Sequence, residues 1–121
     1  MALGSGAFQG PYSFTSRFEA GSDTNPEELI AAAHAACFSM ALSNSLAQAG
    51  HVPTSVDTTA SVHLGKTDEG FGITRIDLVT NGDVPGIDAA EFQKMAEATK
   101  TGCIVSRALG AVDMTLEATL V

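Results

Sequence analysis

Positive charge, cysteine and tryptophan are scarce in this sequence. Of its 121 residues, six are lysine or arginine and fourteen are aspartate or glutamate, which gives a formal net charge of −8. This balance argues against nucleic acid and anionic membrane surfaces as partners, because both are bound through basic patches. The N-terminus has no basic stretch followed by an apolar run, so we expect no signal peptide and a cytoplasmic location. In that reducing compartment, two cysteines are more often reactive or inert than joined in a structural disulfide.

The length and the hydrophobic content suit one globular domain. A chain of 121 residues, of which 45% are hydrophobic, can form a single core without a disulfide. The sequence contains no internal repeat and no low-complexity segment. We therefore expect residues 1–121 to form one domain.

The most distinctive stretch is NPEELIAAAHAACFSMALSNSLAQAG, residues 25–50, which predicts one long helix. Pro26 fits the first helical position, where a missing N–H costs nothing. Asn25 before it can cap the helix together with Glu28, and acidic residues in the first turn complement the helix dipole. Gly50 supplies a left-handed stop at the other end.

The interior of this helix is apolar or small on nearly every side. Between Glu28 and Gly50 the only titratable side chains are His34 and Cys37. Its length of roughly 36 Å would nearly permit a membrane span. Its many alanines and its serine and asparagine residues fall short of the apolar character that a span needs, so we expect no membrane association. Such a helix must instead be covered by other elements of the protein.

Strands and further helices follow from the hydrophobic patterns elsewhere. The predicted strands are residues 12–18, 56–64, 71–80 and 112–120, and the predicted helices are residues 88–102 and 103–109. A change of alternation near Thr74 and Arg75 predicts a β-bulge. The order predicts an α+β fold with an antiparallel sheet on the long helix. One sheet covers one side of that helix only, so we expect a homodimer whose sheets wrap around two central helices.

Cys37 lies near the middle of the long helix and is the first candidate for chemistry. A buried cysteine commonly acts only as a small hydrophobic side chain. A nucleophilic role needs the thiolate, which burial disfavours, and the helix dipole acts only over the first turn. A cation must therefore stabilise it. His34 shares its helix face, and Arg17, which stays charged when desolvated, is the better candidate.

Glu27 is the natural partner for Arg17, through a bidentate ion pair. It precedes Cys37 by ten residues, roughly 15 Å along one helix. It can join a Cys37 site only through the reach of Arg17, or from the antiparallel helix of a partner chain. The alternative is that Glu27 simply complements the helix dipole.

Cys103 opens the predicted short helix, where a thiolate is favoured. It is either an inert buried residue or a thiol that resolves an oxidised Cys37. A metal site on His34 and Cys37, completed by His63 or Cys103, is a weaker alternative because the spacing matches no zinc pattern. The sequence calls for no metal, flavin or haem.

Five segments resemble the OsmC/Ohr family of organic hydroperoxide reductases, in the family's order along the chain. They are PYSFTSRFE (11–19), TNPEELIAAAHAACFSMAL (24–42), PTSVDTTASV (53–62), VPGIDA (84–89) and GCIVSRAL (102–109). The resemblance covers nearly the whole chain and is nearer to OsmC members than to Ohr members. It implies an OsmC-like fold, an intertwined α+β homodimer with its sites at the subunit interface. It also implies a cysteine-based peroxidase of the oxidative and osmotic stress response.

The same resemblance assigns roles to individual residues. It makes Cys37 the peroxidatic thiolate, Cys103 the resolving thiol, Arg17 the activating and binding guanidinium, and Glu27 the carboxylate partner of Arg17. It implies a Cys37 sulfenic acid, a Cys37–Cys103 disulfide, a dithiol reductant of lipoyl type and no cofactor. Apolar walls would favour alkyl or fatty-acid peroxides, and the candidates for these walls are Phe14, Phe18, Phe38 and Met40.

Two departures from the family pattern and two rival functions complete the interpretation. Relatives begin with a strand region that this chain mostly lacks, so we expect a domain shortened at its N-terminus. Relatives carry proline where this chain has Ile104, which is expected to shift the start of the short helix.

An acyl-thioester hydrolase would need an acid or amide placed on the long helix, and no acid follows Glu28 there. The other rival is a non-catalytic dimeric stress or ligand-binding protein with inert thiols.

Overall fold

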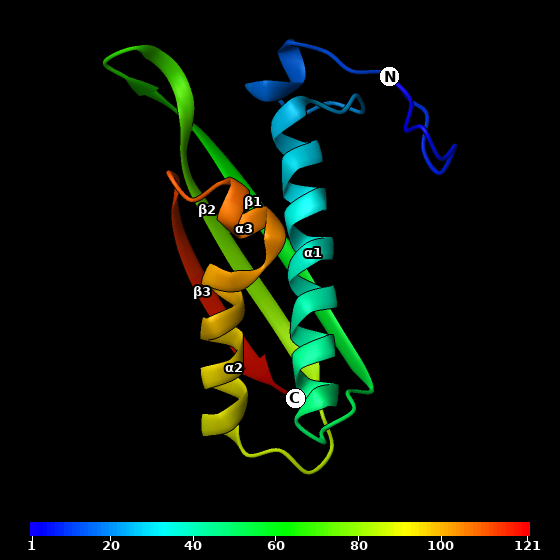
Figure 1. Cartoon of the computed structure of the whole chain (residues 1–121). Coiled ribbons are helices and arrows are strands. Elements are labelled where there is room, and N and C mark those ends of the chain that lie inside the picture. The colour runs from blue at the N-terminus through cyan, green and yellow to red at the C-terminus, as the bar shows by residue number, and fades with distance from the viewer.

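The protein combines three α-helices with one three-stranded sheet, which confirms the predicted α+β class (Figure 1). A computed structural model describes all residues, 1–121. The elements are η1, a 3₁₀ helix (Thr15–Arg17), α1 (Pro26–Gln48), β1 (Ser55–Thr67), β2 (Gly70–Asp83), α2 (Ala89–Gly102), α3 (Ile104–Ala108) and β3 (Asp113–Leu120).

The ends of α1 form as the sequence predicts. The Asn25 side chain accepts a hydrogen bond of 2.9 Å from the backbone N–H of Glu28, and Pro26 occupies the first helical position. Gly50 has a φ of 91°, a left-handed conformation that a side chain would strain. α2 begins in the same way, because Asp88 accepts a 2.8 Å hydrogen bond from the backbone N–H of Glu91.

The sheet is mixed, with the strand order β1-β2-β3. β1 and β2 form the predicted antiparallel hairpin, and the predicted bulge is present: His63 pairs with Arg75 and Leu64 with Ile73, so Thr74 is the extra residue. β3 is parallel to β2, which makes the prediction of a purely antiparallel sheet wrong. The reason is that α2 and α3 form a crossover between the two strands, and a crossover returns the chain in the same direction.

The predicted first strand, residues 12–18, is also wrong. The segment makes one isolated bridge, between Tyr12 and Thr24, and then coils into η1. Ser16 bonds to Ser13 through its backbone N–H and through its hydroxyl, and such local bonds compete with strand pairing. The sheet therefore has three strands rather than four.

The hydrophobic core lies between the sheet and one face of α1 and α2, which cover the same side of the sheet (Figure 1). The buried face of α1 carries side chains at every fourth position, and they are His34, Phe38, Leu42 and Leu46. Phe92 and Ala96 of α2 and Ile76 and Leu78 of β2 complete the core. The ring of Phe92 packs so closely on β2 that a Cβ at Gly82 would lie 2.5 Å from it.

The opposite face of α1 is not covered by this chain. Ala33, Ala36 and Met40 are exposed there, Met40 to 73%. The expectation of a fully enclosed helix is therefore not met within a single chain. By length and composition α1 could also cross a membrane, a test that the core helices of soluble proteins pass as well.

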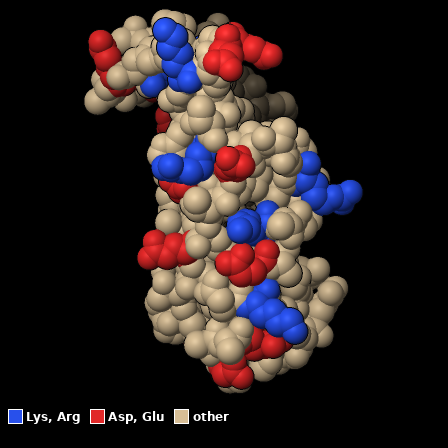
Figure 2. Space-filling model, turned by 90° about the vertical axis from the view of Figure 1, so that its left-hand side faces the viewer, with Lys and Arg blue, Asp and Glu red and all other residues tan.

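Charged side chains are distributed rather than segregated. On the face drawn in Figure 2, acidic and basic residues are interspersed, and uncharged surface separates them. Although the net charge is −8, the acidic residues on this face do not gather into one large patch.

Candidate active site

Both cysteines line one apolar groove on the uncovered face of α1. Cys37 is half-buried on α1, and Cys103 is buried where α2 ends and α3 begins. The groove has a volume of about 640 Å³ and is lined by Ala33, Ala36, Cys37, Met40, Ala41, Asn44, Gly102, Cys103 and Ile104. Neither cysteine is in a disulfide. The fold thus places at one site two thiols that are distant in the sequence.

The position of Cys37 follows from the periodicity of α1. Cys37 adjoins the buried Phe38, so it lies at the border between the core stripe and the uncovered face. The position of Cys103 follows from the end of α2 at Gly102. Cys103 has an extended backbone, with ψ of 148°, and caps α3 with its own side chain.

Cys103 is held by a short chain of hydrogen bonds. The backbone N–H of Ser106 donates to Cys103 Sγ at 3.3 Å, and the thiol donates to Ser106 Oγ at 3.1 Å. Ser106 Oγ is in turn 2.7 Å from His34 Nε2. Burial lowers the pKa of His34 below its ordinary value, so its imidazole is neutral at neutral pH. Sequence reasoning missed Ser106, because its contact with His34 joins residues 72 positions apart and no local pattern signals it.

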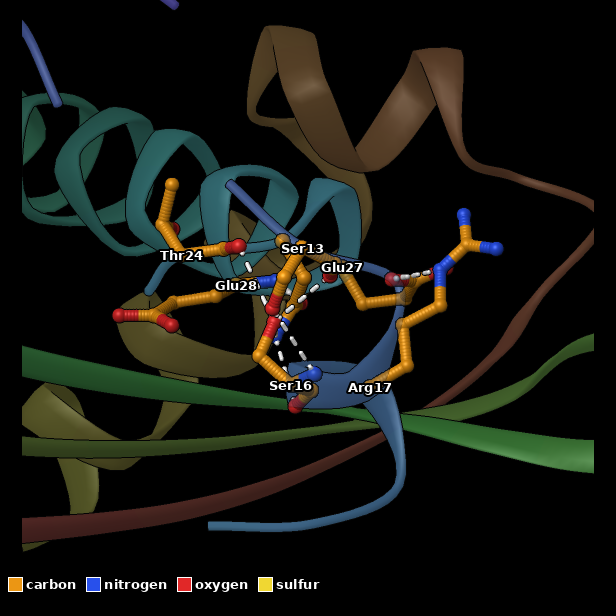
Figure 3. Close-up of polar contacts among 7 residues, drawn as sticks. Ser13, Ser16, Arg17, Thr24, Glu27 and Glu28 are labelled. Carbon is orange, nitrogen blue, oxygen red and sulfur yellow. Dashed lines mark hydrogen bonds and ion pairs between the residues drawn. The ribbon is translucent and has the colours of Figure 1, made fainter. Parts of the chain in front are cut away.

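The structure contains the expected ion pair between Arg17 and Glu27 (Figure 3). Arg17 Nε lies 3.1 Å from Glu27 Oε2, a single contact rather than the bidentate pair that the sequence suggested. Figure 3 shows the terminal nitrogens of Arg17 directed away from α1. The guanidinium carbon also lies 5.6 Å from the ring centre of Phe14, within cation–π range. The free end of Arg17 is therefore available to a ligand or to another chain.

Arg17 does not lie in the groove of its own Cys37. Arg17 and Glu27 line a separate depression of about 370 Å³, next to Ala31, Val62 and His63. Ten residues of α1, roughly 15 Å, separate Glu27 from Cys37. Within one chain the structure therefore does not bring together the guanidinium and the thiol that the sequence paired.

The predicted apolar wall residues fall into three groups. Phe14 and Phe18 form an exposed aromatic cluster with Phe71 of the hairpin, with ring centres 5.3 and 5.4 Å apart. Met40 lines the cysteine groove. Phe38 is fully buried in the core, so it is a packing residue and we drop it from the candidate substrate contacts.

The structure offers no set of ligands for the alternative metal site on His34 and Cys37. No group of three or more histidine, cysteine, aspartate or glutamate side chains is placed to hold an ion. His63, one proposed third ligand, bonds to Asp77 at 2.7 Å. His34 bonds to Ser106 instead of facing the groove with Cys37.

The sequence matches one family over most of its length. The family described as OsmC-like protein matches residues 19–117. The chain is 57% identical over 109 residues to Peroxiredoxin OsmC of Escherichia coli, an alignment that covers 90% of this chain and 76% of that protein. It is 40% identical over 98 residues to an organic hydroperoxide resistance protein of Xanthomonas axonopodis, covering 79% of this chain and 67% of that protein.

Solved structures give the same family likeness. The fold matches that of OhrB, an organic hydroperoxide resistance protein of Bacillus subtilis, with a TM-score of 0.71 and 32% identity over 82% of this chain and 73% of that one. It matches an organic hydroperoxide resistance protein from Elizabethkingia anophelis with a TM-score of 0.82 and 27% identity, over 99% of this chain and 86% of that one.

Proposed function

The chain belongs to the OsmC-like protein family, and on that premise we propose that it is a cysteine-based peroxidase that reduces organic hydroperoxides to alcohols. One observation supports this function most strongly: Cys37 and Cys103, from separate elements, line the same apolar groove. Two inert core cysteines would have no reason to share an open groove. The rival of a thioester hydrolase has less support, because no acidic side chain lines that groove and Asn44 is the one amide there.

In the first step, the Cys37 thiolate attacks the distal oxygen of the hydroperoxide. An S–O bond forms, the O–O bond breaks, and the alkoxide leaves as an alcohol after taking up a proton. Cys37 is left as a sulfenic acid. Its half-buried position gives a peroxide access to the sulfur.

In the second step, Cys103 attacks the Cys37 sulfenic acid. An S–S bond forms, the S–O bond breaks, and the hydroxide leaves with the thiol proton as water. A dithiol reductant, of lipoyl type by family likeness, then restores both thiols by exchange through a mixed disulfide. Because Cys103 is 2% exposed, it must turn toward the groove for this step.

Arg17 and Glu27 act from a second copy of the chain in this proposal. The uncovered face of α1 is apolar and carries Cys37. An exposed apolar patch of this kind is typical of a protein–protein interface, and here the proposed partner is a second copy of the chain. In a homodimer with antiparallel central helices, the Arg17–Glu27 pair of one protomer meets the Cys37 groove of the other. Arg17 there holds Cys37 as the thiolate and polarises the peroxide, and Glu27 orients Arg17.

The proposed substrates are alkyl or fatty-acid hydroperoxides. Seven of the nine residues that line the cysteine groove are hydrophobic, including Met40. The exposed rings of Phe14 and Phe18 lie beside Arg17 and would extend the apolar wall when the partner brings them to the groove. An apolar wall binds an alkyl chain and gives hydrogen peroxide nothing to contact.

Cys37→Ser tests the function directly. With cumene hydroperoxide and a dithiol reductant, we expect the wild type to turn over and the variant to lose all turnover. A serine hydroxyl is not ionised at neutral pH and cannot replace the thiolate as the nucleophile. Titration of free thiols after one equivalent of peroxide gives an independent measurement. Loss of two thiols per chain supports the cysteine pair, loss of one excludes Cys103 as the resolving thiol, and loss of none excludes the peroxidase.

A further inference from the structure

We propose that His34 and Ser106 form a proton relay for Cys103, which deprotonates this thiol as it attacks the sulfenic acid of Cys37. The inference rests on the proposed peroxidase function and adds to it two residues that act on the second step alone. Both act through Cys103, so they are positioning and proton-transfer residues that need not touch the peroxide.

The contacts form an unbroken path from the sulfur to the imidazole. Cys103 Sγ is 3.1 Å from Ser106 Oγ, and Ser106 Oγ is 2.7 Å from His34 Nε2. All three side chains are buried, with exposures of 2%, 3% and 0%. A hydrogen-bonded chain out of contact with water transfers a proton between its ends without exchange with solvent.

The directions of these bonds leave His34 ready to accept a proton. The thiol donates to the Ser106 hydroxyl, so that hydroxyl can donate its own proton onward to His34 Nε2. In the tautomer that the relay requires, the neutral ring carries its proton on Nδ1, which is buried and has no hydrogen-bond partner. A buried donor without a partner is destabilising, and folded proteins contain few of them.

The surroundings of His34 keep the imidazole neutral between turnovers. Desolvation alone lowers its pKa, and no charged side chain contributes to the shift. The other titratable groups on its own helix are Glu27, Glu28 and Cys37, which lies one turn along from His34. Cys103 caps α3, and Arg107 lies in its last turn. On the far side of Ser106, a separate depression is lined by Lys100, Arg107 and Asp113 from α2, α3 and β3. Neutral imidazole is the form that can act as a base.

The proposed step is balanced. The S–H bond of Cys103 breaks, its proton passes to Ser106 Oγ, and the serine proton passes to His34 Nε2. The S–S bond to Cys37 forms while the S–O bond of the sulfenic acid breaks. The hydroxide leaves as water once it takes up one proton, and His34 returns to the neutral form by releasing one.

Two variants test the relay, one at its middle group and one at its final acceptor. Ser106→Ala removes the middle group, and His34→Gln keeps a polar atom near Ser106 but cannot take up a proton. In single-turnover reactions with one equivalent of cumene hydroperoxide, we expect oxidation of Cys37 to keep its wild-type rate. We expect disulfide formation to slow by about 10²-fold at neutral pH in each variant. Cys37 sulfenic acid should accumulate and be trapped by dimedone.

The pH dependence separates a relay from a merely structural role. At alkaline pH, hydroxide deprotonates the Cys103 thiol directly, so the defect of both variants should shrink as the pH rises. A loss of packing would persist at every pH. Ser39→Ala is the matched control, because it removes a serine hydroxyl of α1 that bonds Thr58 at 2.7 Å and takes no part in the relay. Circular dichroism melting verifies that each variant folds.

The outcomes are distinct for the relay and for the peroxidase. A wild type that loses two thiols, with variants that form the disulfide at the wild-type rate at neutral pH, would overturn the relay alone. A slow step that is the same at every pH, or that Ser39→Ala shares, would overturn it too. A wild type that loses no thiol would overturn the peroxidase and the relay with it.

Discussion

Arg17 shows how much a single side chain depends on its surroundings. Its Nε is engaged by Glu27, and its terminal nitrogens point away from its own α1. An arginine anchored on one side and free on the other is suited to hold an anion from outside the chain, because the anchor removes part of the conformational entropy that binding would cost. The peroxidase proposal therefore makes Glu27 matter through Arg17.

Two neighbouring glutamates in the first turn of α1 give a matched comparison. Glu27 pairs with Arg17, whereas the side chain of Glu28 makes no ion pair. Glu27→Gln should therefore lower kcat/KM for cumene hydroperoxide by about tenfold, since a neutral amide orients the guanidinium less firmly. Glu28→Gln should leave kcat/KM within about twofold of the wild type. Equal losses in the two variants would show that only the charge at the helix start matters.

The three strands are tied together on their outer face by one carboxylate. Asp77 of β2 accepts hydrogen bonds from Thr115 of β3 at 2.6 Å and from Arg75 at 2.8 Å, and it bonds His63 of β1 at 2.7 Å. The bond from Thr115 contributes most, followed by that from Arg75, and together they hold the pKa of Asp77 well below its usual range. The parallel pair β2–β3, which the sequence did not reveal, is one of the contacts that Asp77 secures.

The lowered pKa of Asp77 makes a prediction about acid stability. A carboxyl whose folded pKa is depressed contributes stability above its unfolded pKa of about 4, and that contribution is lost as the pH falls toward the folded value. Asp77→Asn should therefore lower the melting temperature at neutral pH and flatten its decline below about pH 4. Asp57→Asn, on the exposed face of β1, is the control. Parallel acid limbs in wild type and Asp77→Asn would contradict the prediction.

α1 has two functions on two faces. One face carries the core stripe that fixes the sheet, and a polar thread from Ser39 through Thr58 to Thr80 links the helix to β1 and β2 with bonds of 2.7 and 2.9 Å. The other face is small and apolar and carries Cys37. The helix therefore shows little amphipathic contrast, because the face that a second chain would cover is nearly as apolar as the core face.

For the whole molecule, the separation of Arg17 from Cys37 within one chain predicts shared sites. Arg17→Met and Cys37→Ser should each abolish turnover when assayed alone. Refolding the two variants together in equal amounts should restore about a quarter of the wild-type activity. Half of the dimers are then mixed, and one of the two sites in each mixed dimer is intact. The measurement is peroxide consumption per total protein.

The mixing experiment has a clear contrary result. If Arg17 served the Cys37 of its own chain, no mixed dimer would hold a site with both residues, and activity would stay absent after refolding. Sedimentation of the wild type supplies the control, because it establishes that dimers form under the conditions of the assay. A monomeric and active wild type would contradict the dimeric arrangement altogether.

The sequence by itself determined the long helix, its caps, the hairpin with its bulge and the α2–α3 segment. These features depend on local chemistry: Asn25 and Pro26 at a helix start, Gly50 at its end, and an alternation that changes at Thr74. The residue types also make Cys37, Cys103, Arg17 and Glu27 candidates for the site, because thiolate chemistry needs a cysteine and a cation to stabilise it. Their roles stay predictions.

Only the tertiary structure decided how these pieces meet. The parallel pairing of β3, the coiling of residues 12–18 and the burial of Phe38 depend on contacts between segments far apart in the chain. The same holds for the contact of Ser106 with His34, which joins α3 to α1. Local propensity is weak against such long-range packing, so an alternating pattern like that of residues 12–18 can serve aromatic contacts as well as a strand.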